Sequence, residues 1–212
     1  MERRTMERRT RGPGAQHERR RREISDAVLE IVAERGLPAV SLTEVAARAA
    51  VSPGRVQHYF PTKDRLIEAA FDRGNRRSAA RIAAKVGQDL ETAPPRPVLT
   101  AVLTELIPYD DETRAHMRVR QSFTGLALAD EGIAARMREE YTRFHHRLAL
   151  LVRRDQDAGL IARSLDARDA ATGLAALAEG LAYYVLIGLT PPGTARDQVL
   201  AAVDALYGGP DG

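Results

Sequence analysis

Apolar residues recur at intervals of three and four along most of the 212-residue chain, which is the periodicity of amphipathic α-helices. In the first such segment Ile24, Val28 and Ile31 share one face, and Gly36 follows as a helix stop. No stretch shows the period of two that indicates a strand, so the pattern predicts an all-α fold of about nine helices. The expected helices cover residues 18–35, two short segments that begin at Ser41 and Ser52, residues 63–88, 96–107, 112–128, 132–154 and 166–188, and a last segment after Gly193.

The two short helices lie between Ser41 and Lys63. Ser41 and Glu44 have the spacing of a capping box, in which each side chain binds the other residue's backbone N–H. Ser52 caps the following helix, and Pro53 occupies its first position, where a missing N–H does no harm. Two short helices joined by a tight turn form a helix-turn-helix, although an ordinary pair of surface helices has the same spacing.

The second helix of this pair has one apolar and one polar face. Val56 and Phe60 lie four residues apart and are expected to face the core. The residues that point elsewhere are Arg55, Gln57, His58 and Tyr59, followed by Lys63. Arginine pairs with guanine or phosphate, glutamine reads adenine and tyrosine binds phosphate, so this face has the chemistry that recognises duplex DNA.

The run from Ser41 through VSPGRVQHYFPTKDRL resembles the DNA-binding domain of TetR-type transcriptional repressors. The likeness extends over residues 18 to about 72, and its closing motif is Tyr59-Phe60-Pro61-Thr62-Lys63. Further along, LAYYVLIG followed by TPPGTARDQVLAAVDAL is similar to the last two helices of the regulatory domain in the choline-operon-repressor branch. The resemblance implies a three-helix DNA-binding domain and a helical domain that binds a ligand and dimerises.

The resemblance also implies which residues contact DNA, and these are Thr43, Ser52, Arg55, Gln57, Tyr59 and Lys63. Two positions depart from the family pattern. Ala50 stands in the turn where the family usually has glycine, so either a strained turn or a slightly different one is expected. Gln57 stands where many members have a tyrosine that binds phosphate. It is expected either to contact a phosphate or to read a base.

Charge and composition divide the chain into four parts. Residues 1–80 carry 17 Lys and Arg against 11 Asp and Glu, whereas residues 81–212 carry 15 against 18, so only the front favours a polyanion. We expect a disordered basic tail over residues 1–17, a DNA-binding domain over 18–62, a connecting helix over 63–88 and a ligand-binding and dimerisation domain over 89–212. The tail, with its repeated MERRT, is either an arm that touches DNA or an alternative start of the protein.

In the last part, the helix over residues 166–188 is the most apolar and is rich in Ala and Gly. A seam between two subunits and a buried core helix both explain this composition, and the dimer is favoured because helix-turn-helix proteins bind paired half-sites. The expected dimer residues are Leu174, Leu177, Leu181, Val185, Val199 and Val203. The expected ligand-binding residues, each of which plain core packing also explains, are Tyr109, Met117, Phe123, Tyr141, Phe144, His145, Tyr183 and Tyr184.

Other classes of protein find little support. The chain has no Cys, which removes disulfides, thiolate metal sites and cysteine nucleophiles. No apolar run reaches the ~18 residues that cross a bilayer and no signal peptide opens the chain, so a cytoplasmic protein is expected. Adjacent His145 and His146 point about 100° apart on a helix, and no catalytic or phosphate-binding motif is present. We therefore expect neither an enzyme nor a protein with a metal or cofactor.

The sequence thus predicts a ligand-responsive DNA-binding regulator of transcription. As a repressor it would be a homodimer on a palindromic duplex operator, from which a small-molecule effector releases it. Two alternatives stay open at this point. One is a helical interaction module that binds a protein or a membrane surface, and the other is a DNA-binding regulator or activator without a small effector.

Overall fold

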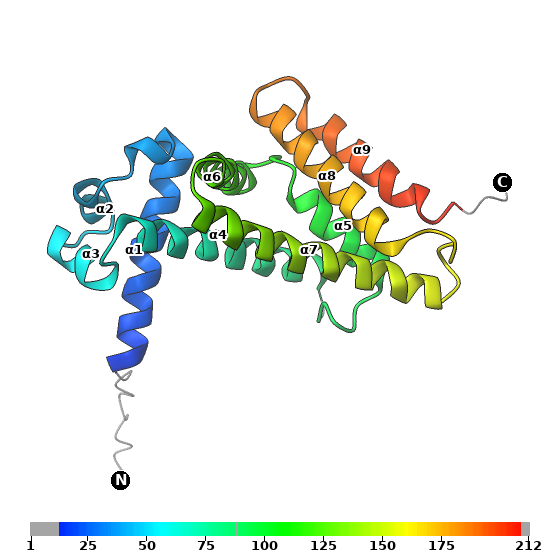
Figure 1. Ribbon diagram of the computed structural model, residues 1–212, viewed down its shortest axis with the longest axis horizontal. Helices are drawn as coiled ribbons and strands as arrows, with labels where there is room; N and C mark the ends of the chain where they lie inside the picture. Colours follow the sequence, from blue (N-terminus) through cyan, green and yellow to red (C-terminus); the bar gives the residue numbers. More distant parts are fainter. Residues whose placement is uncertain (1–12, 88, 209–212) are drawn as a thin grey trace, which may run out of the picture.

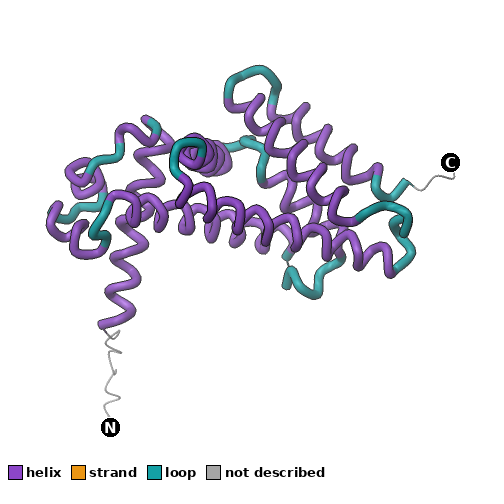
Figure 2. Tube along the Cα trace, in the orientation of Figure 1, coloured by secondary structure: helices purple, strands orange, loops and turns teal. Residues whose placement is uncertain are grey.

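The structure is a computed structural model that describes residues 13–87 and 89–208, and every regular element in these ranges is helical (Figure 2). The all-α prediction is confirmed. The helices are α1 (Pro13–Arg35), α2 (Leu42–Arg48), α3 (Pro53–Tyr59), α4 (Lys63–Val86), α5 (Pro95–Glu105), α6 (Asp111–Ala127), α7 (Glu131–Asp157), α8 (Ala167–Leu186) and α9 (Pro192–Ala205), with a 3-10 turn at Leu37–Ala39.

The beginning of α1 corrects one expectation. The helix starts at Pro13 rather than near residue 18, so residues 13–17 are helical and do not belong to a disordered tail. The rest of that predicted tail, residues 1–12, lies outside the described residues. One contact helps to hold the extra turn: the ring of His17 lies 4.7 Å from the ring of Tyr59, between centroids.

Side-chain caps fix where the front helices begin. Ser41, Ser52 and Thr62 each accept a hydrogen bond at 3.2 Å from the backbone N–H three residues later. The capping box predicted for Ser41 forms only in one direction, because the Glu44 carboxylate binds Arg35 at the end of α1 instead. This ion pair ties α2 to α1 and replaces the local contact with a tertiary one.

The front of the molecule is a small helical domain built on one hydrophobic cluster. Its α1, α2 and α3 pack around fully buried side chains such as Ile24, Val45 and Val56, and the first turns of α4 complete it. The same cluster also contains Val119 of α6 and Met137 of α7. The rear helices therefore pack directly into the core of the front domain.

The rear of the molecule is a second helical body, formed by α5 to α9 (Figure 1). Its core joins Leu99 and Leu103 of α5 with Met117 of α6 and with the inner faces of α7, α8 and α9. Helices α8 and α9 lie side by side at the end of the body away from the front domain (Figure 1). None of the described helices has the length and apolarity needed to cross a membrane.

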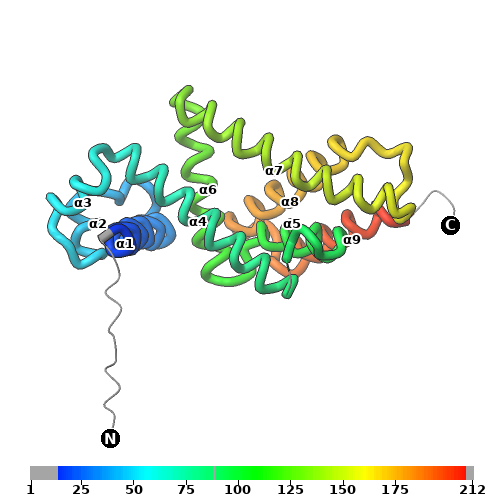
Figure 3. Tube along the Cα trace, turned by 90° about the horizontal axis from the view of Figure 1, so that it is seen from below, coloured from blue at the N-terminus to red at the C-terminus, as the bar shows by residue number. Residues whose placement is uncertain are grey.

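Helix α4 runs from the front domain into the rear body, as Figure 3 shows. At the front, Arg73 donates to both carboxylate oxygens of Asp26 on α1, at 2.8 and 3.0 Å. At the rear, Arg81 and Lys85 both bind Glu105 of α5, whose side chain is completely buried. The helix ends at Gly87, which adopts the left-handed conformation with φ of 72°.

Candidate DNA-binding surface and ligand cavity

Helix α3 is anchored by its apolar face. Val56 and Phe60 are 0% and 1% exposed, so the helix is held against the domain core at its middle and at its C-terminal end. Arg55, Gln57 and His58 are exposed as a result. Each of them projects from a rigid, capped helix, which is the arrangement that positions side chains for groove recognition.

The other predicted DNA-contact residues surround this helix. Thr43 in α2 and Lys63 at the start of α4 are exposed, and Ser52 is exposed while it caps α3. Tyr59 is half-buried, because its ring packs against His17 of α1. Within the described residues, neither Arg55 nor Lys63 is held in an ion pair, so both cations are available to an outside anion.

The turn between α2 and α3 contains the one non-glycine residue of positive φ in the described ranges. Ala50 has φ of 51°, in the left-handed region that glycine occupies without strain. For an alanine this conformation is unfavourable by roughly 1 kcal/mol, because its Cβ approaches the following carbonyl oxygen. The strained turn predicted from Ala50 is therefore confirmed.

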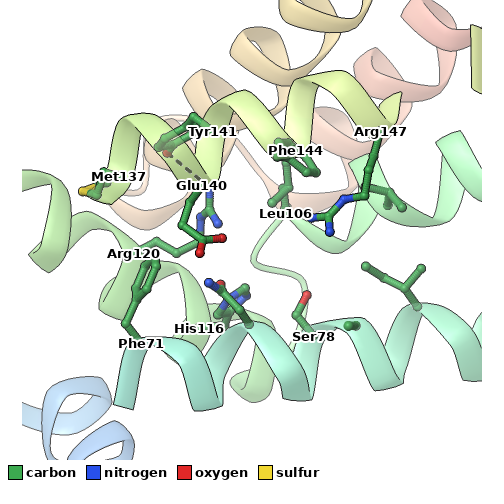
Figure 4. Close-up of a pocket in the computed structure, with 14 residues that line it drawn as sticks. Phe71, Ser78, Leu106, His116, Arg120, Met137, Glu140, Tyr141, Phe144 and Arg147 are labelled. Atoms are coloured by element: carbon green, nitrogen blue, oxygen red, sulfur yellow. Dashed lines mark hydrogen bonds between the residues drawn. The ribbon is translucent and has the colours of Figure 1, made fainter. Parts of the chain in front are cut away.

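A cavity of about 140 Å³ lies in the rear body, between α4, α6 and α7, with α5 at one end (Figure 4). Its wall combines aliphatic and aromatic side chains with a few polar and charged ones. The lining residues are Phe71, Asn75, Ser78, Ala79, Ile82, Val102, Leu106, His116, Arg120, Met137, Glu140, Tyr141, Phe144 and Arg147. This combination is typical of small-molecule sites.

Two polar side chains of α6 form the inner wall of the cavity. Arg120 donates through Nη2 to the hydroxyl of Tyr141, at 3.2 Å, and to the carboxylate of Glu179 on α8. His116 is 6% exposed, and burial, with Arg120 and Arg81 nearby, lowers its pKa to about 3. The imidazole is therefore neutral at pH 7, and its Nε2 lies 3.4 Å from Oδ1 of Asn75.

The cavity brings together only two of the eight residues predicted to bind a ligand, Tyr141 and Phe144. Met117 is fully buried in the rear core, and Phe123 stacks on Phe71 and lines a smaller neighbouring cavity. His145 does not line the cavity. Tyr109 binds Glu105 at the end of α4, and Tyr183 and Tyr184 are exposed on α8, so none of these three reaches it either.

The prediction missed the residues of α4 and every charged residue in the wall, because it considered only large side chains of the rear helices. Arg120 carried a signal in the sequence. It lies three residues from both Met117 and Phe123, on the apolar face of α6, where an arginine must find buried partners. Glu140 and Arg147 lie on a helix rich in charged residues and carry no such signal.

The expected dimer residues also need correction. Five of the six, Leu174, Leu181, Val185, Val199 and Val203, are at most 7% exposed inside a single subunit, so their side chains belong to its core. Leu177 is 38% exposed. It lies on an outward stripe of α8 made of Gly173, Leu177, Gly180, Tyr184 and Ile187, all exposed.

The chain is similar to known regulators along most of its length. Residues 24–70 match the family of bacterial regulatory proteins called the tetR family, and residues 95–208 match the C-terminal domain of BetI-type transcriptional repressors. The HTH-type transcriptional regulator BetI of Burkholderia cenocepacia is 32% identical over 167 residues, which cover 76% of this chain and 79% of the relative.

Solved structures show the same fold. A Rhodococcus protein described as a TetR-family transcriptional regulator has a TM-score of 0.78 and 27% identity, over 89% of this chain and 99% of the other. A Saccharomonospora viridis protein, described as a transcriptional regulator and crystallised with choline, has a TM-score of 0.76 over 88% of this chain and 96% of the other. At 24% identity, this second likeness shows the fold alone.

Proposed function

This chain belongs to the TetR family of bacterial transcriptional regulators, and we propose that it is a homodimeric repressor which a small molecule releases from a palindromic operator. The observation that carries the proposal is the shared packing of its two functional regions. Helices α6 and α7, which form the cavity wall, also place Val119 and Met137 in the core that holds the recognition helix α3. A molecule in the cavity thus acts on the DNA-binding domain through direct contacts.

In the proposed complex, α3 lies in the major groove. Arg55 and Gln57 face the bases or phosphates, while Thr43, Ser52, Tyr59 and Lys63 bind the DNA backbone around them. Support comes from their exposure on and next to α3, whose apolar residues Val56 and Phe60 are buried; only Tyr59 is half-buried. The four arginines of α1, residues 19–22, continue the positive charge beside α3, since Arg21 lies 4.8 Å from the centre of the Phe60 ring.

The proposed dimer forms through the outward stripe of α8 together with the outer face of α9. Gly173 and Gly180 have open space around them, so the helix of a second subunit can approach the backbone closely. Leu177, Tyr184 and Ile187 provide the apolar area, and each is at least 38% exposed in the single subunit. An exposed apolar stripe on α8, flanked by the mostly polar and small exposed residues of α9, suits a two-fold, self-complementary interface.

Release from DNA follows from the contacts that join the cavity to the front domain. Arg118 of α6 donates to the carbonyl oxygen of Ala33 near the end of α1. Arg136 of α7 binds Asp72 at 2.8 Å and Glu68 at 3.0 Å, both on α4. An effector that prefers a displaced position of α6 and α7 would favour that position and, through these contacts, shift α1 and α4. The distance between the two α3 helices of the dimer would then change. The extent of the shift depends on how strongly the effector prefers the displaced form. The choline bound by the Saccharomonospora viridis relative supports a small molecule as effector.

Selection of bound fragments from a random DNA pool tests the proposal. We expect an enriched palindrome with half-sites about one helical turn or somewhat more apart, bound in a salt-sensitive manner by a dimer. Sequence-independent binding, or none, would favour an interaction module that binds protein or membrane. Sequence-specific binding that no small molecule alters would indicate a regulator without an effector.

A further inference from the structure

The charged groups in the wall of the cavity are not all held in ion pairs within the described residues. Three charged residues line it: Arg120 from α6, and Glu140 and Arg147 from α7. Glu140 is paired with Arg143, one turn further along α7, which also binds Glu139. Arg147, in contrast, has no ion pair within the described residues, and Figure 4 shows its side chain reaching into the cavity beside Phe144. The neutral imidazole of His116 adds no charge.

Arg120 is only partly satisfied by its own chain. Both of its hydrogen bonds leave from Nη2, to Tyr141 and to Glu179. Its Nε is buried and has no acceptor, although 16% of the side chain as a whole is exposed. A buried ionic donor without an acceptor is unfavourable, and an oxygen atom of a ligand would remove that penalty.

The same arginine disfavours a cationic ligand. A quaternary ammonium is held by aromatic faces that surround it, and the Tyr141 ring is the natural centre of such a cage here. The guanidinium of Arg120 already lies 5.4 Å from the centre of that ring. A second cation at this place would meet Arg120 directly and would approach Arg147, so these two arginines disfavour the class of molecule that the aromatic side chains alone would suggest.

From these contacts we propose that the effector is an organic carboxylate with an apolar body, an inference that rests on the regulator proposed above. The carboxylate would bind the guanidinium of Arg120, whose hydrogen bonding is incomplete, with Arg147 facing the same negative charge from α7. The apolar body would lie along Phe71, Leu106 and Phe144. Binding at Arg120 would act on α6, the helix whose Arg118 and Val119 contact α1.

Matched pairs of ligands test the sign of the charge. Hexanoate, octanoate, phenylbutanoate and indole acetate are each compared with the trimethylammonium compound that carries the same apolar group, by calorimetric titration of the full chain. We expect at least one carboxylate to bind about tenfold or more tightly than its partner, which corresponds to about 1.4 kcal/mol. A set in which no carboxylate exceeds its cationic partner, including one in which nothing binds, would overturn the proposal.

Variants locate the binding group. Arg120→Gln is made together with Glu179→Gln, so that no half-buried carboxylate is left without its partner. This double variant is expected to weaken the best carboxylate about tenfold or more and to lose the preference over the cation. Arg138→Gln removes an exposed arginine of α7 that is paired with Glu131, and serves as the control that leaves the affinity unchanged.

Two further measurements keep the result interpretable. If the double variant does not fold, Arg147→Gln at the cavity mouth takes its place and is expected to weaken carboxylate binding severalfold while cation binding improves. An unchanged preference in either variant contradicts the proposal. Operator binding by the ligand-free protein is measured in parallel, because a chain that binds its operator but prefers cations refutes this inference and leaves the proposed repressor standing.

Discussion

The front domain and the rear body use their charged side chains in opposite ways. At the front, Arg55 and Lys63 stand exposed and without ion pairs in the described part of the chain, above a small apolar core. In the rear, Glu105 and Asp155 are at most 3% exposed, and each is bound by residues from other parts of the chain. The two cations of the front surface are thus available to an external anion, whereas the two buried carboxylates of the rear find their partners within the subunit.

This difference shows which charged groups are available to an outside partner. Exposed cations cost the fold little and remain available for a polyanion, with an affinity that salt weakens. Buried charged groups are tolerated only with partners, so one that still has a donor atom without an acceptor is conspicuous. Arg120, with its unpartnered Nε, is such a group in the rear, and it lines the cavity.

The largest expected effect comes from removing a buried charge of the rear body. Glu105→Ala leaves Arg81 and Lys85 without their common acceptor, and we expect the free energy of unfolding to fall by about 3 kcal/mol or more. Glu112→Ala is the matched control, because Glu112 pairs with the same Arg81 from an exposed position. It is expected to change stability by less than about 1 kcal/mol. Chemical denaturation measures the free energy of unfolding of both variants. Equal losses would contradict the expected difference between the buried and the exposed carboxylate.

At the front, the expected effect is on DNA binding and not on stability. Arg55→Ala should weaken operator binding by about 1–3 kcal/mol, as expected for a lost base contact, while the dimer and its unfolding curve stay unchanged.

Lys63→Ala should weaken binding to all sequences alike and reduce the salt slope by about one unit. Gel shifts over a range of salt distinguish the two. Normal operator affinity in the Arg55 variant would remove it from the reading surface.

The front domain was predictable because its geometry is set by local signals. Caps at Ser41, Ser52 and Thr62 fix where three helices begin, and the spacing of Val56 and Phe60 fixes which face of α3 is exposed. The two misses there, the helical residues 13–17 and the one-sided capping box, both involve tertiary contacts, of His17 with Tyr59 and of Glu44 with Arg35.

The rear helices were also predicted, to within a few residues at their ends, but the cavity lining and the exposed stripe of α8 were not. Leu174 and Leu177 are equally apolar, yet one is buried and the other exposed, because the packing of α8 against α7 and α9 decides which face is inside. Periodicity does not distinguish a face buried in one subunit from a face buried between two. The residues of α4 in the cavity wall likewise depend on how distant helices assemble.

A smaller effect concerns His116, which is buried and neutral in the rear body. Its pKa is about 3 in the folded chain against 6.5 for the free side chain, so between these values the unfolded state binds more protons. The free energy of unfolding therefore falls as the pH falls below about 6.5, by up to about 1.4 kcal/mol per unit. His116→Gln should remove this slope between about pH 7 and 5, whereas His146→Gln, an exposed change, should keep it. Parallel curves for the His116 variant and the parent would refute the assignment.

The smallest effect tests the strain in the front turn. Ala50 has φ of 51°, and glycine adopts this conformation without the clash of a Cβ, so Ala50→Gly is expected to stabilise the domain by roughly 0.5–1 kcal/mol. Ala47→Gly, three residues earlier and inside α2, should instead destabilise it by about 1 kcal/mol, because there glycine only adds freedom to the unfolded chain. Opposite signs from the same substitution would show that backbone conformation at single positions determines the front domain's geometry. A loss of stability in both variants would mean that Ala50 does not adopt the left-handed conformation. The turn, and with it the angle between α2 and α3, would then differ from the one described.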